Sequence, residues 1–306
     1  MAAAETTRCG YVALIGAPNA GKSTLLNTLV GSKIAIVTPK VQTTRSRIIG
    51  IALHGTAQII FVDTPGIFEP RRRLDRAMVR AAWVGANDAD VRVLLVDATR
   101  AKNGVADGES ARIVADLRRT GTDAILALNK IDAVAKNSLL ALAENSSKDG
   151  PFLAVFMISA LAGDGLADLV DDLVARLPEG PWLYPEDQIA EVPLRQLAAE
   201  ITREKLYLAL RQELPYAATV ETESWKERDD GSVRIEQIIY IERDSQKAIV
   251  LGKGGRQIKE IGAASRIELE QMLERRVHLF IFVKVRPKWG DDPERYREIG
   301  LEFPGS

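Results

Sequence analysis

The stretch Gly16-Ala17-Pro18-Asn19-Ala20-Gly21-Lys22-Ser23 decides the fold of the first half of the chain. It follows the apolar run Tyr11 to Ile15 and precedes a helical pattern from Thr24 to Val30, so it predicts a strand, a loop and a helix. The spacing GxxxxGK[ST] is that of a phosphate-binding loop, in which backbone N–H groups surround a phosphate chain. We expect Lys22 to reach the terminal phosphates and Ser23 to ligate Mg2+, next to the positive end of the helix dipole.

A second element, Asn129-Lys130-Ile131-Asp132, directly follows the apolar run Ala124 to Leu128. It has the NKxD pattern, in which a carboxylate can accept both the ring N1–H and the exocyclic amine of guanine, groups that adenine does not offer. We expect Asp132 to read the base, Asn129 to brace the base and its loop, and the stem of Lys130 to cover the face of the base. Four common residues also suit a solvated turn, but the order of the motifs along the chain favours the guanine site.

A carboxylate lies between these two motifs, in Asp63-Thr64-Pro65-Gly66 at the end of the apolar run Gln58 to Val62. In a doubly wound sheet the carboxyl end of this strand lies beside the phosphate loop, so Asp63 is expected to hold Mg2+ through water. The N–H of Gly66 would then meet a γ-phosphate. The same four residues also suit a plain turn.

Two further loops complete the set of a GTPase. Gln42-Thr43-Thr44-Arg45 precedes the next strand, and a threonine here would touch Mg2+ and sense the γ-phosphate. We favour Thr44, because related GTPases carry a Thr-Arg pair at this place, and Thr43 stays the alternative. Ser159-Ala160-Leu161 follows the apolar run Phe152 to Ile158, and its backbone would contact the guanine oxygen.

These motifs predict an α/β P-loop GTPase domain with a doubly wound mixed sheet, and they assign three overlapping sets of residues. The catalytic set is Lys22, Thr44, Asp63 and Gly66. The magnesium set is Ser23, Thr44 and Asp63. The set that binds GTP or GDP is Gly16, Ala17, Pro18, Asn19, Ala20, Gly21, Lys22, Ser23, Thr24, Asp63, Thr64, Pro65, Gly66, Asn129, Lys130, Asp132, Ser159, Ala160 and Leu161.

One position limits the chemistry. Ras-like enzymes place a glutamine directly after the DxxG glycine to orient the attacking water, whereas this chain has Ile67. We therefore expect slow intrinsic hydrolysis that relies on Lys22, Mg2+ and backbone donors, unless another residue, a bound cation or a partner completes the site. Arg71, Arg72 and Arg73 follow in the second switch, where a run of charge is more typical of a solvated or contact surface than of a catalytic arginine.

The composition is typical of a soluble, cytosolic protein of about two domains, with 306 residues and a formal net charge of −1. Cys9 is the single cysteine, which excludes an intramolecular disulfide. Met1 to Arg8 lacks the character of a signal or transit peptide, and no apolar run approaches the roughly 20 residues of a membrane span. His54 and His278 are the two histidines, too few and too far apart in sequence to suggest a metal site.

A cluster of prolines after the first half of the chain marks a boundary between domains. We expect the GTPase domain over residues 1–180, a linker over 181–194, a second domain over 195–288 and a C-terminal tail over 289–306. The second domain carries 18 Lys and Arg against 15 Asp and Glu, a modest basic bias. Trp289 and the acidic tail behind it are expected to pack back on the second domain.

The second domain holds the other informative motif, Gly252-Lys253-Gly254-Gly255, flanked on both sides by helical patterns. A GxxG loop lets single-stranded RNA backbone approach closely, while basic residues meet the phosphates and a neighbouring apolar groove holds the bases. The other elements are a helix over 194–213, strands over 217–226 and 232–243, a helix over 256–275 and a strand over 277–285. Their order is that of an α+β type 2 KH domain.

Two sets of residues around this loop are assigned to RNA. The RNA-binding set is Lys247, Gly252, Lys253, Gly254, Gly255, Arg256 and Lys259. The residues expected to line the apolar groove are Ile249, Val250, Ile258 and Ile261. The groove is the weaker assignment, because aliphatic residues at helical spacing also form plain core.

With GAPNAGKS, QTTRSR, DTPG, NKID and SAL in the first half and VLGKGGRQIKEIG in the second, the chain closely resembles the Era family of bacterial GTPases over almost its whole length. The resemblance implies binding near the 3′ end of 16S rRNA, a role in assembly or maturation of the 30S ribosomal subunit, and peripheral association with the inner face of the cell membrane. A monomer is expected. We also expect the nucleotide state to gate RNA binding, because GTP and Mg2+ would order both switch loops.

Two other classes of protein stay open. The first is a tRNA-modifying or other ribosome-associated GTPase that shares only the nucleotide domain, and the GxxG motif argues against it. The second is a nucleotide switch whose second domain serves as an adaptor for a protein or membrane partner.

Overall fold

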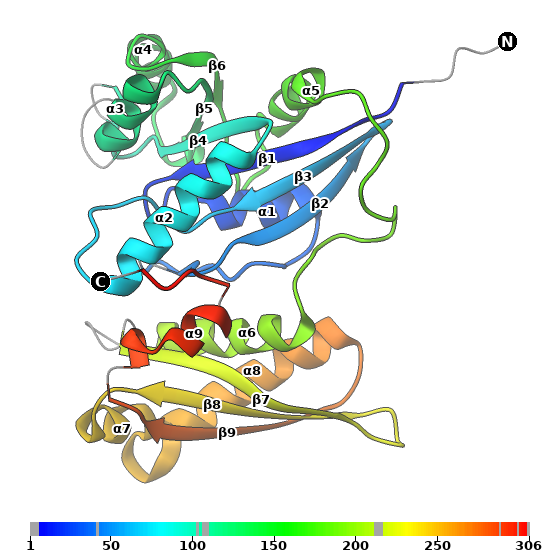
Figure 1. Ribbon diagram of the computed structural model, residues 1–306, viewed down its shortest axis with the longest axis vertical. Helices are drawn as coiled ribbons and strands as arrows, with labels where there is room; N and C mark the ends of the chain where they lie inside the picture. Colours follow the sequence, from blue (N-terminus) through cyan, green and yellow to red (C-terminus); the bar gives the residue numbers. More distant parts are fainter. Residues whose placement is uncertain are drawn as a thin grey trace, which may run out of the picture. The chain divides into compact units, whose positions relative to one another are not determined.

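The computed structural model describes residues 6–40, 43–101, 104–105, 110–210, 217–287, 289–298 and 300–304. The chain forms two compact units (Figure 1). The first unit comprises Met1–Ala35, Thr44–Glu191 and Ile299–Ser306, and the second comprises Ile36–Thr43 and Val192–Glu298. The chain therefore passes from one unit to the other four times.

The first unit is built on a six-stranded sheet with the strand order β2-β3-β1-β4-β5-β6 (Figure 1). Its strands are β1 (Arg8–Gly16), β2 (Ile48–His54), β3 (Ala57–Asp63), β4 (Val91–Asp97), β5 (Ala124–Asn129) and β6 (Phe152–Met157). The sheet is mixed, because β2 runs antiparallel to β3 while every other neighbouring pair is parallel. Parallel strands need helical crossovers that cover the sheet, which explains why the central strands read as almost continuous apolar runs.

Helices alternate with these strands on both sides of the sheet (Figure 1). They are α1 (Lys22–Val30), α2 (Arg73–Asp88), α3 (Ala111–Thr120), α4 (Lys136–Ser147) and α5 (Leu166–Arg176), with the 3-10 turn η2 (Ile131–Ala133) after β5. On one face, Ala82 of α2, Ile113 of α3 and Leu142 of α4 share a core with Leu94 and Leu126 of the sheet. The predicted α/β P-loop domain is thus confirmed, and the carboxyl ends of its parallel strands meet at the edge where the motifs lie.

Residues 178–191 form a strap along the first unit. Isolated β-bridges join the two ends of the strap to β1 and β2. The buried Gln58 holds its middle, because Oε1 accepts from the N–H groups of Leu183 and Tyr184 at 2.9 and 3.0 Å and Nε2 donates to the Tyr184 carbonyl at 2.8 Å. Most of the segment expected to be a linker, residues 181–194, therefore packs on the first unit, and the division between the units falls at the end of the strap.

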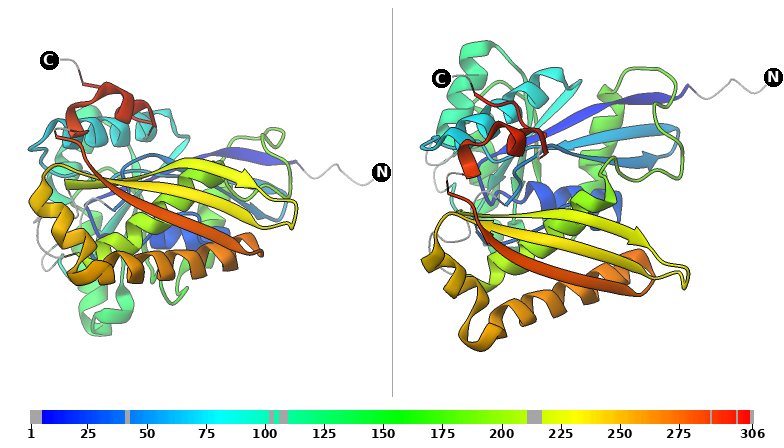
Figure 2. Two further views of the ribbon diagram at one scale, coloured as in Figure 1. Left: turned by 90° about the horizontal axis from the view of Figure 1, so that it is seen from below. Right: turned by 60° about the horizontal axis from the view of Figure 1, so that its bottom comes forward.

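The second unit carries a three-stranded sheet, β7-β8-β9, in which β7 and β8 are antiparallel and β8 and β9 parallel. Its elements are α6 (Leu194–Ala209), β7 (Ala218–Glu227), β8 (Val233–Ile241), α7 (Asp244–Leu251), the 3-10 turn η4 (Lys253–Gly255), α8 (Arg256–Leu273), β9 (Val277–Val285), the 3-10 turn η5 (Trp289–Asp291) and α9 (Pro293–Glu298). Figure 2 shows α6 and α8 side by side on one face of this sheet. The order of elements from α6 to β9 confirms the predicted α+β type 2 KH domain.

The helix predicted over 194–213 ends at Ala209, and residues 211–213 lie outside the described part of the chain. Across the described residues, no helix is both long enough and apolar enough to cross a membrane.

The C-terminal tail divides between the two units. Trp289 is buried in the second unit, where its indole Nε1 donates to the carbonyl of Ala217 at 2.9 Å. Residues 300–304 lie with the first unit, where the ring of Phe303 lies 5.0 Å from the guanidinium of Arg73 on α2. The expectation that the whole tail packs on the second domain is therefore wrong for residues 300–304.

Replacing Gln58 with leucine is expected to destabilise the first unit by about 2–4 kcal/mol, because two N–H groups of the strap lose their acceptor. Urea unfolding followed by tryptophan fluorescence measures the loss, since Trp182 lies in the strap. Gln188→Leu is the matched control, because the side chain of Gln188 makes a single hydrogen bond among the described residues, to the carbonyl of Ala190 at 3.2 Å. This control should lose less than about 1 kcal/mol, and equal losses in the two variants would contradict the role given to Gln58.

Candidate active site and RNA-binding loop

The phosphate loop connects β1 to α1 through backbone conformations that glycine adopts most easily. Gly16 and Gly21 have φ values of 153° and 101°. A Cβ atom on Gly16 would come within 2.4 Å of the Leu95 carbonyl oxygen, and one on Gly21 within 2.2 Å of the side-chain nitrogen of Asn129. The loop therefore needs glycine at both positions, for space as well as for conformation.

Lys22 points back into this loop from the first turn of α1. It is 6% exposed, and its Nζ donates to the carbonyls of Gly16 at 3.1 Å and Ala17 at 3.0 Å. Burial lowers the pKa of Lys22 to about 8, and the nearby Asp63 opposes part of this shift. The hydrogen bonds of the buried ammonium go to neutral carbonyls, so a phosphate group would supply the charge compensation that the loop itself does not.

Three oxygen-bearing side chains meet beside the loop. Ser23 Oγ donates to Asp63 Oδ2 at 2.6 Å and lies 2.8 Å from Thr44 Oγ1, which in turn lies 3.3 Å from the same carboxylate oxygen. Asp63 is fully buried, and its Oδ1 has no hydrogen-bond partner among the described residues. Burial raises the pKa of Asp63, although Lys22 and the two hydroxyls oppose the shift. This donor set fits Mg2+, which prefers hard oxygen ligands.

Thr43 lies away from these three side chains. Its hydroxyl lies 2.7 Å from the hydroxyl of Thr38 and donates to the carbonyl of Lys40 at 2.7 Å. Of the two threonines that the sequence leaves open, Thr44 is therefore the one whose hydroxyl lies beside Ser23.

The guanine motif stands at the end of β5. Asn129 is buried, and its side chain donates to the carbonyl of Ala20 at 2.8 Å and accepts from the N–H of Ala160 at 2.9 Å. Asp132 is exposed, and its Oδ1 accepts from the hydroxyl of Ser159 at 2.6 Å. Asn129 thus joins the phosphate loop to the Ser-Ala-Leu loop, while Ser159 acts through its side chain by orienting the Asp132 carboxylate.

Asp97 belongs to this region, although sequence reasoning did not single it out. It ends β4, and its carboxylate accepts from Lys130 Nζ at 2.6 Å and from the Thr99 hydroxyl at 2.6 Å. Burial by itself raises the pKa of Asp97. The hydrogen bonds from Lys130 and Thr99 lower it by more, so the pKa of Asp97 is below its usual value. Asp97 therefore fixes the Lys130 stem that is expected to cover the base. The available signal was its place at the carboxyl end of an apolar strand, the same place as Asp63.

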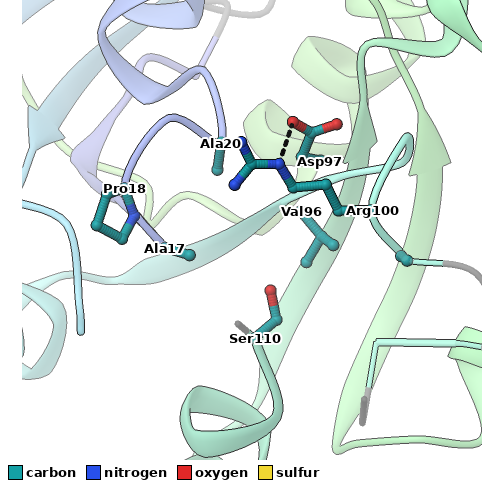
Figure 3. Close-up of a pocket in the computed structure, with 8 residues that line it drawn as sticks. Ala17, Pro18, Ala20, Val96, Asp97, Arg100 and Ser110 are labelled. Atoms are coloured by element: carbon teal, nitrogen blue, oxygen red, sulfur yellow. Dashed lines mark ion pairs between the residues drawn. The ribbon is translucent and has the colours of Figure 1, made fainter. Parts of the chain in front are cut away.

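A small pocket lies against the phosphate loop at this point (Figure 3). Its lining consists of Ala17, Pro18, Ala20, Val96, Asp97, Arg100, Ala101 and Ser110. The guanidinium of Arg100 lies 3.7 Å from the Asp97 carboxylate and extends toward Ala20 (Figure 3). The pocket is thus a continuation of the nucleotide site rather than a separate one.

The DxxG segment passes close to the phosphate loop. Thr64 is buried and donates to a carbonyl of β1 at 2.8 Å, and a Cβ on Gly66 would come within 2.9 Å of Pro18. Ile67 is 3% exposed, donates its N–H to the Gly16 carbonyl at 3.0 Å and packs in the core of the first unit. A side chain buried in the core cannot orient an attacking water, which is the reason to expect slow intrinsic hydrolysis.

The remaining predicted residues of the GTP site lie on the same loops. The phosphate loop is completed by Ala17, Pro18, Asn19 and Ala20, and Thr24 lies in the first turn of α1. Pro65 is buried between Thr64 and Gly66. Leu161 is 82% exposed in the loop after β6.

The GxxG loop of the second unit lies between α7 and α8. Gly252, Gly254 and Gly255 have φ values of 70°, 61° and 75°. A Cβ on Gly252 would come within 2.8 Å of Gln257, whereas Cβ atoms on Gly254 and Gly255 would meet no described residue other than their chain neighbours within 4 Å. The first glycine is therefore required by the fold, and the other two present open backbone in a conformation that other residues adopt at a cost.

The charged residues around this loop face solvent. Lys253, Arg256 and Lys259 are exposed and Lys247 is partly exposed. Arg256 pairs with Glu260 at 2.8 Å on the surface of α8. These side chains are free to turn toward a ligand, because surface ion pairs are worth little.

The predicted apolar groove is only partly present. Ile249 is 54% exposed beside the loop. Val250 and Ile261 are buried in the core of the second unit, and Ile258 packs against that core. The groove assignment is therefore wrong for Val250 and Ile261, because α7 and α8 direct these side chains toward the sheet.

Two family models match the chain. One, described as a 50S ribosome-binding GTPase, matches residues 11–130, and the other, described as a KH domain, matches residues 213–290. Together with the fold and the two loops, these matches define a P-loop GTPase joined to a KH domain.

Relatives of this class align over nearly the full length. The chain is 62% identical to the GTPase Era of Sinorhizobium medicae over 303 residues, 99% of this chain and 96% of that protein. It is 59% identical to the GTPase Era of Brucella suis over 301 residues, 98% of this chain and 96% of that protein. The chain belongs to the Era family of GTPases, and it is a GTPase.

Two solved structures are similar at 40% identity, each aligned over 96% of this chain and 99% of the other. One is an Era variant of Aquifex aeolicus bound to GDP·AlF4−, with a TM-score of 0.90. The other is Era in complex with MgGDPNP and nucleotides 1506–1542 of 16S ribosomal RNA, with a TM-score of 0.89.

Replacing Asp132 with asparagine is expected to weaken GDP binding about ten- to a hundredfold, because an amide cannot accept from both guanine N–H groups. Xanthine nucleotides, which carry a carbonyl in place of the guanine amine, should bind the variant more tightly than the wild type. Fluorescence titration with GDP and XDP measures both affinities. Asp123→Asn is the control, because Asp123 is an exposed carboxylate directly before β5. An unchanged ratio of GDP to XDP affinity would contradict the role of Asp132.

Thr44→Ala is expected to raise the Mg2+ concentration needed for GTP hydrolysis about tenfold, because one of three oxygen donors is lost. Thr43→Ala is the matched neighbour and should leave the Mg2+ requirement nearly unchanged. Single-turnover hydrolysis at a series of Mg2+ concentrations compares the two. A larger effect at Thr43 would reverse the assignment of the switch threonine.

Proposed function

We propose that the protein binds the 3′ end region of 16S rRNA and acts in assembly or maturation of the 30S ribosomal subunit. The observation that carries this proposal is the open backbone at Gly254 and Gly255, held at positive φ and surrounded by exposed lysine and arginine. In KH domains a loop of this kind clamps the backbone of single-stranded RNA. The solved Era complex with nucleotides 1506–1542 of 16S rRNA, similar over 96% of this chain, supports the choice of RNA.

The GTP site would work by positioning and electrostatics. Lys22 and the N–H groups of the phosphate loop would bind the phosphates, Asp132 would bind the base and the N–H of Gly66 would meet the γ-phosphate. Ser23, Thr44 and Asp63 would hold Mg2+. The ion, when bound, neutralises charge that develops on the phosphate oxygens. The slow intrinsic rate expected without a glutamine at position 67 suits a protein that holds RNA until a partner triggers release.

We also propose that the nucleotide state gates RNA binding. GTP would order the segments that carry Thr44 and Gly66, and the ordered state would favour the RNA-binding arrangement. Such coupling is reciprocal, so bound RNA must raise the affinity for a GTP analogue by the same factor. A cytoplasmic location remains a prediction from the composition, and peripheral association with the inner face of the cell membrane remains a prediction from the family resemblance. A monomeric state also remains a prediction.

A fluorescent oligonucleotide with the sequence of the 3′ end of small-subunit rRNA tests the proposal by anisotropy, with GDP or a non-hydrolysable GTP analogue present. The double variant Gly254→Asp, Gly255→Asp is expected to lose at least about tenfold in RNA affinity, because it adds strain and negative charge where the phosphates pass. Gly231→Asp is the matched control, since Gly231 also has positive φ, at 78°, and open space, but lies in the turn between β7 and β8.

The outcomes separate the parts of the proposal. Equal RNA affinity with GDP and with the GTP analogue would refute gating and leave RNA binding in place. An equal loss in Gly231→Asp would remove the GxxG loop as the binding element. Absence of RNA binding in every nucleotide state would favour the alternative, a switch whose second domain serves a protein or membrane partner.

A further inference from the structure

Two adjacent and oppositely charged residues are buried on helix α6. Arg203 is 1% exposed and Glu204 is 3% exposed. Buried charges are costly unless they are paired and hydrogen-bonded, and a helix can pack on a sheet without them. The groups that Arg203 and Glu204 bind therefore indicate the structural role of these two residues.

The guanidinium of Arg203 donates hydrogen bonds to one side chain and to one backbone carbonyl. Its Nη2 donates to the carbonyl of Thr43, and its Nε donates to Glu200 at 2.8 Å. The planar group also lies 5.1 Å from the ring of Tyr207. The forked geometry of arginine allows these contacts together, whereas a lysine would supply a single charged point.

Glu204 and Lys40 hold the same segment at two further points. Glu204 Oε1 accepts from the backbone N–H of Val37 at 2.9 Å. Lys40 Nζ donates to the carbonyls of Tyr207 and Leu210, at the carboxyl end of α6. The described residues of Ile36–Thr43 are thus tied to α6 at Val37, Lys40 and Thr43, which explains why this segment belongs to the second unit. We call residues 36–45, which include the two candidate switch threonines, the first switch.

The held segment ends one peptide bond before the magnesium site. Thr43 offers its carbonyl to Arg203, and the next residue, Thr44, places its hydroxyl 2.8 Å from Ser23 and 3.3 Å from Asp63. Consecutive Cα atoms are about 3.8 Å apart and the peptide between them is planar. A displacement of the Thr43 carbonyl is therefore passed to Thr44 with little loss.

The same helix shares a core with the helices that flank the GxxG loop. Leu206 and Leu210 of α6 pack in one cluster with Val250 of α7 and Ile261 of α8. Close-packed cores transmit small shifts instead of absorbing them. A change at the loop between α7 and α8 can thus reach α6, and through α6 the first switch.

We infer that Arg203 and Glu204 are positioning residues of the GTPase site, which set Thr44 for Mg2+ and link that threonine to the RNA-binding helices. The link to RNA rests on the proposed RNA-binding function, whereas the effect on Mg2+ does not. Both residues are far from the nucleotide motifs in sequence, so their role is inferred from the contacts that hold the first switch at Val37, Lys40 and Thr43.

The first test is Arg203→Met, a change of similar length that removes every donor. It is expected to raise the Mg2+ concentration at half-maximal binding of a GTP analogue about fivefold or more, while GDP affinity, which rests on the phosphate loop and residues 129–132, serves as the internal reference. The ratio of RNA affinities with GTP analogue and with GDP should fall toward one. Arg195→Met is the matched control, because Arg195 lies on the same helix but donates to the carbonyls of Thr222 and Glu223 on β7.

A second pair of variants guards against a mere folding defect. Glu204→Gln keeps an acceptor for the Val37 N–H, whereas Glu204→Met removes it, so the methionine variant should show the larger Mg2+ effect. If Arg203→Met does not fold, Arg203→Lys keeps the positive charge without the fork and should shift the Mg2+ requirement in the same direction by a smaller factor.

The outcomes of this test and of the proposed function are distinguishable. Wild-type protein that binds no RNA would refute the proposed function, while the Mg2+ titration would still decide the role of Arg203. Variants with unchanged Mg2+ requirement and an unchanged RNA affinity ratio would overturn the inference. A shift of equal size in Arg195→Met would also overturn it, because the effect would then belong to α6 in general.

Discussion

The Asn129 side chain makes the contact on which the nucleotide site depends. It ties the phosphate loop at Ala20 to the Ser-Ala-Leu loop at Ala160. These loops follow β1 and β6, and Asn129 at the end of β5 lies between them in the strand order β1-β4-β5-β6. The contact is possible because Gly21 has no Cβ, which would come within 2.2 Å of the amide. Gly21 is thus needed both for the conformation of the phosphate loop and for the contact with Asn129, so the proposed phosphate and base subsites are mechanically linked.

The interior of this site carries charges that its own groups do not fully compensate. Lys22 donates to neutral carbonyls, and Asp63 keeps one buried oxygen without a partner among the described residues. Burial favours the neutral form of each group: it lowers the pKa of Lys22 and raises the pKa of Asp63. These two groups reduce the folding stability of the first unit, because transferring a charge from water to a buried site costs free energy. Phosphate and Mg2+ are groups that would compensate these charges, so their binding to the proposed site would be favourable.

The sequence predicted the parts of the site that share a local pattern, because a motif at the end of an apolar strand lies at a known edge of a parallel sheet. It did not predict Gln58, Asp97 or Arg203, each of which has a role defined by partners distant in sequence. Arg203 meets a carbonyl 160 positions away, and no local spacing marks one arginine among the 41 basic residues as that partner. Helical periodicity identified an apolar face at Val250 without telling whether that face meets a ligand or a sheet.

The boundary between Thr43 and Thr44 is the place where the chain could couple the second unit to the proposed magnesium site. The strap before the passage at residues 191 and 192 is fixed to the first unit through Gln58, and none of its described contacts reaches the nucleotide motifs. The passage after Thr43 is different, because α6 holds one side of the peptide bond and the magnesium set includes the residue on the other side. A switch threonine anchored in this way cannot change position without moving against Arg203. Under the proposed gating, nucleotide state and the RNA-binding helices would compete for one short piece of backbone, which has few alternative conformations in which to absorb the conflict.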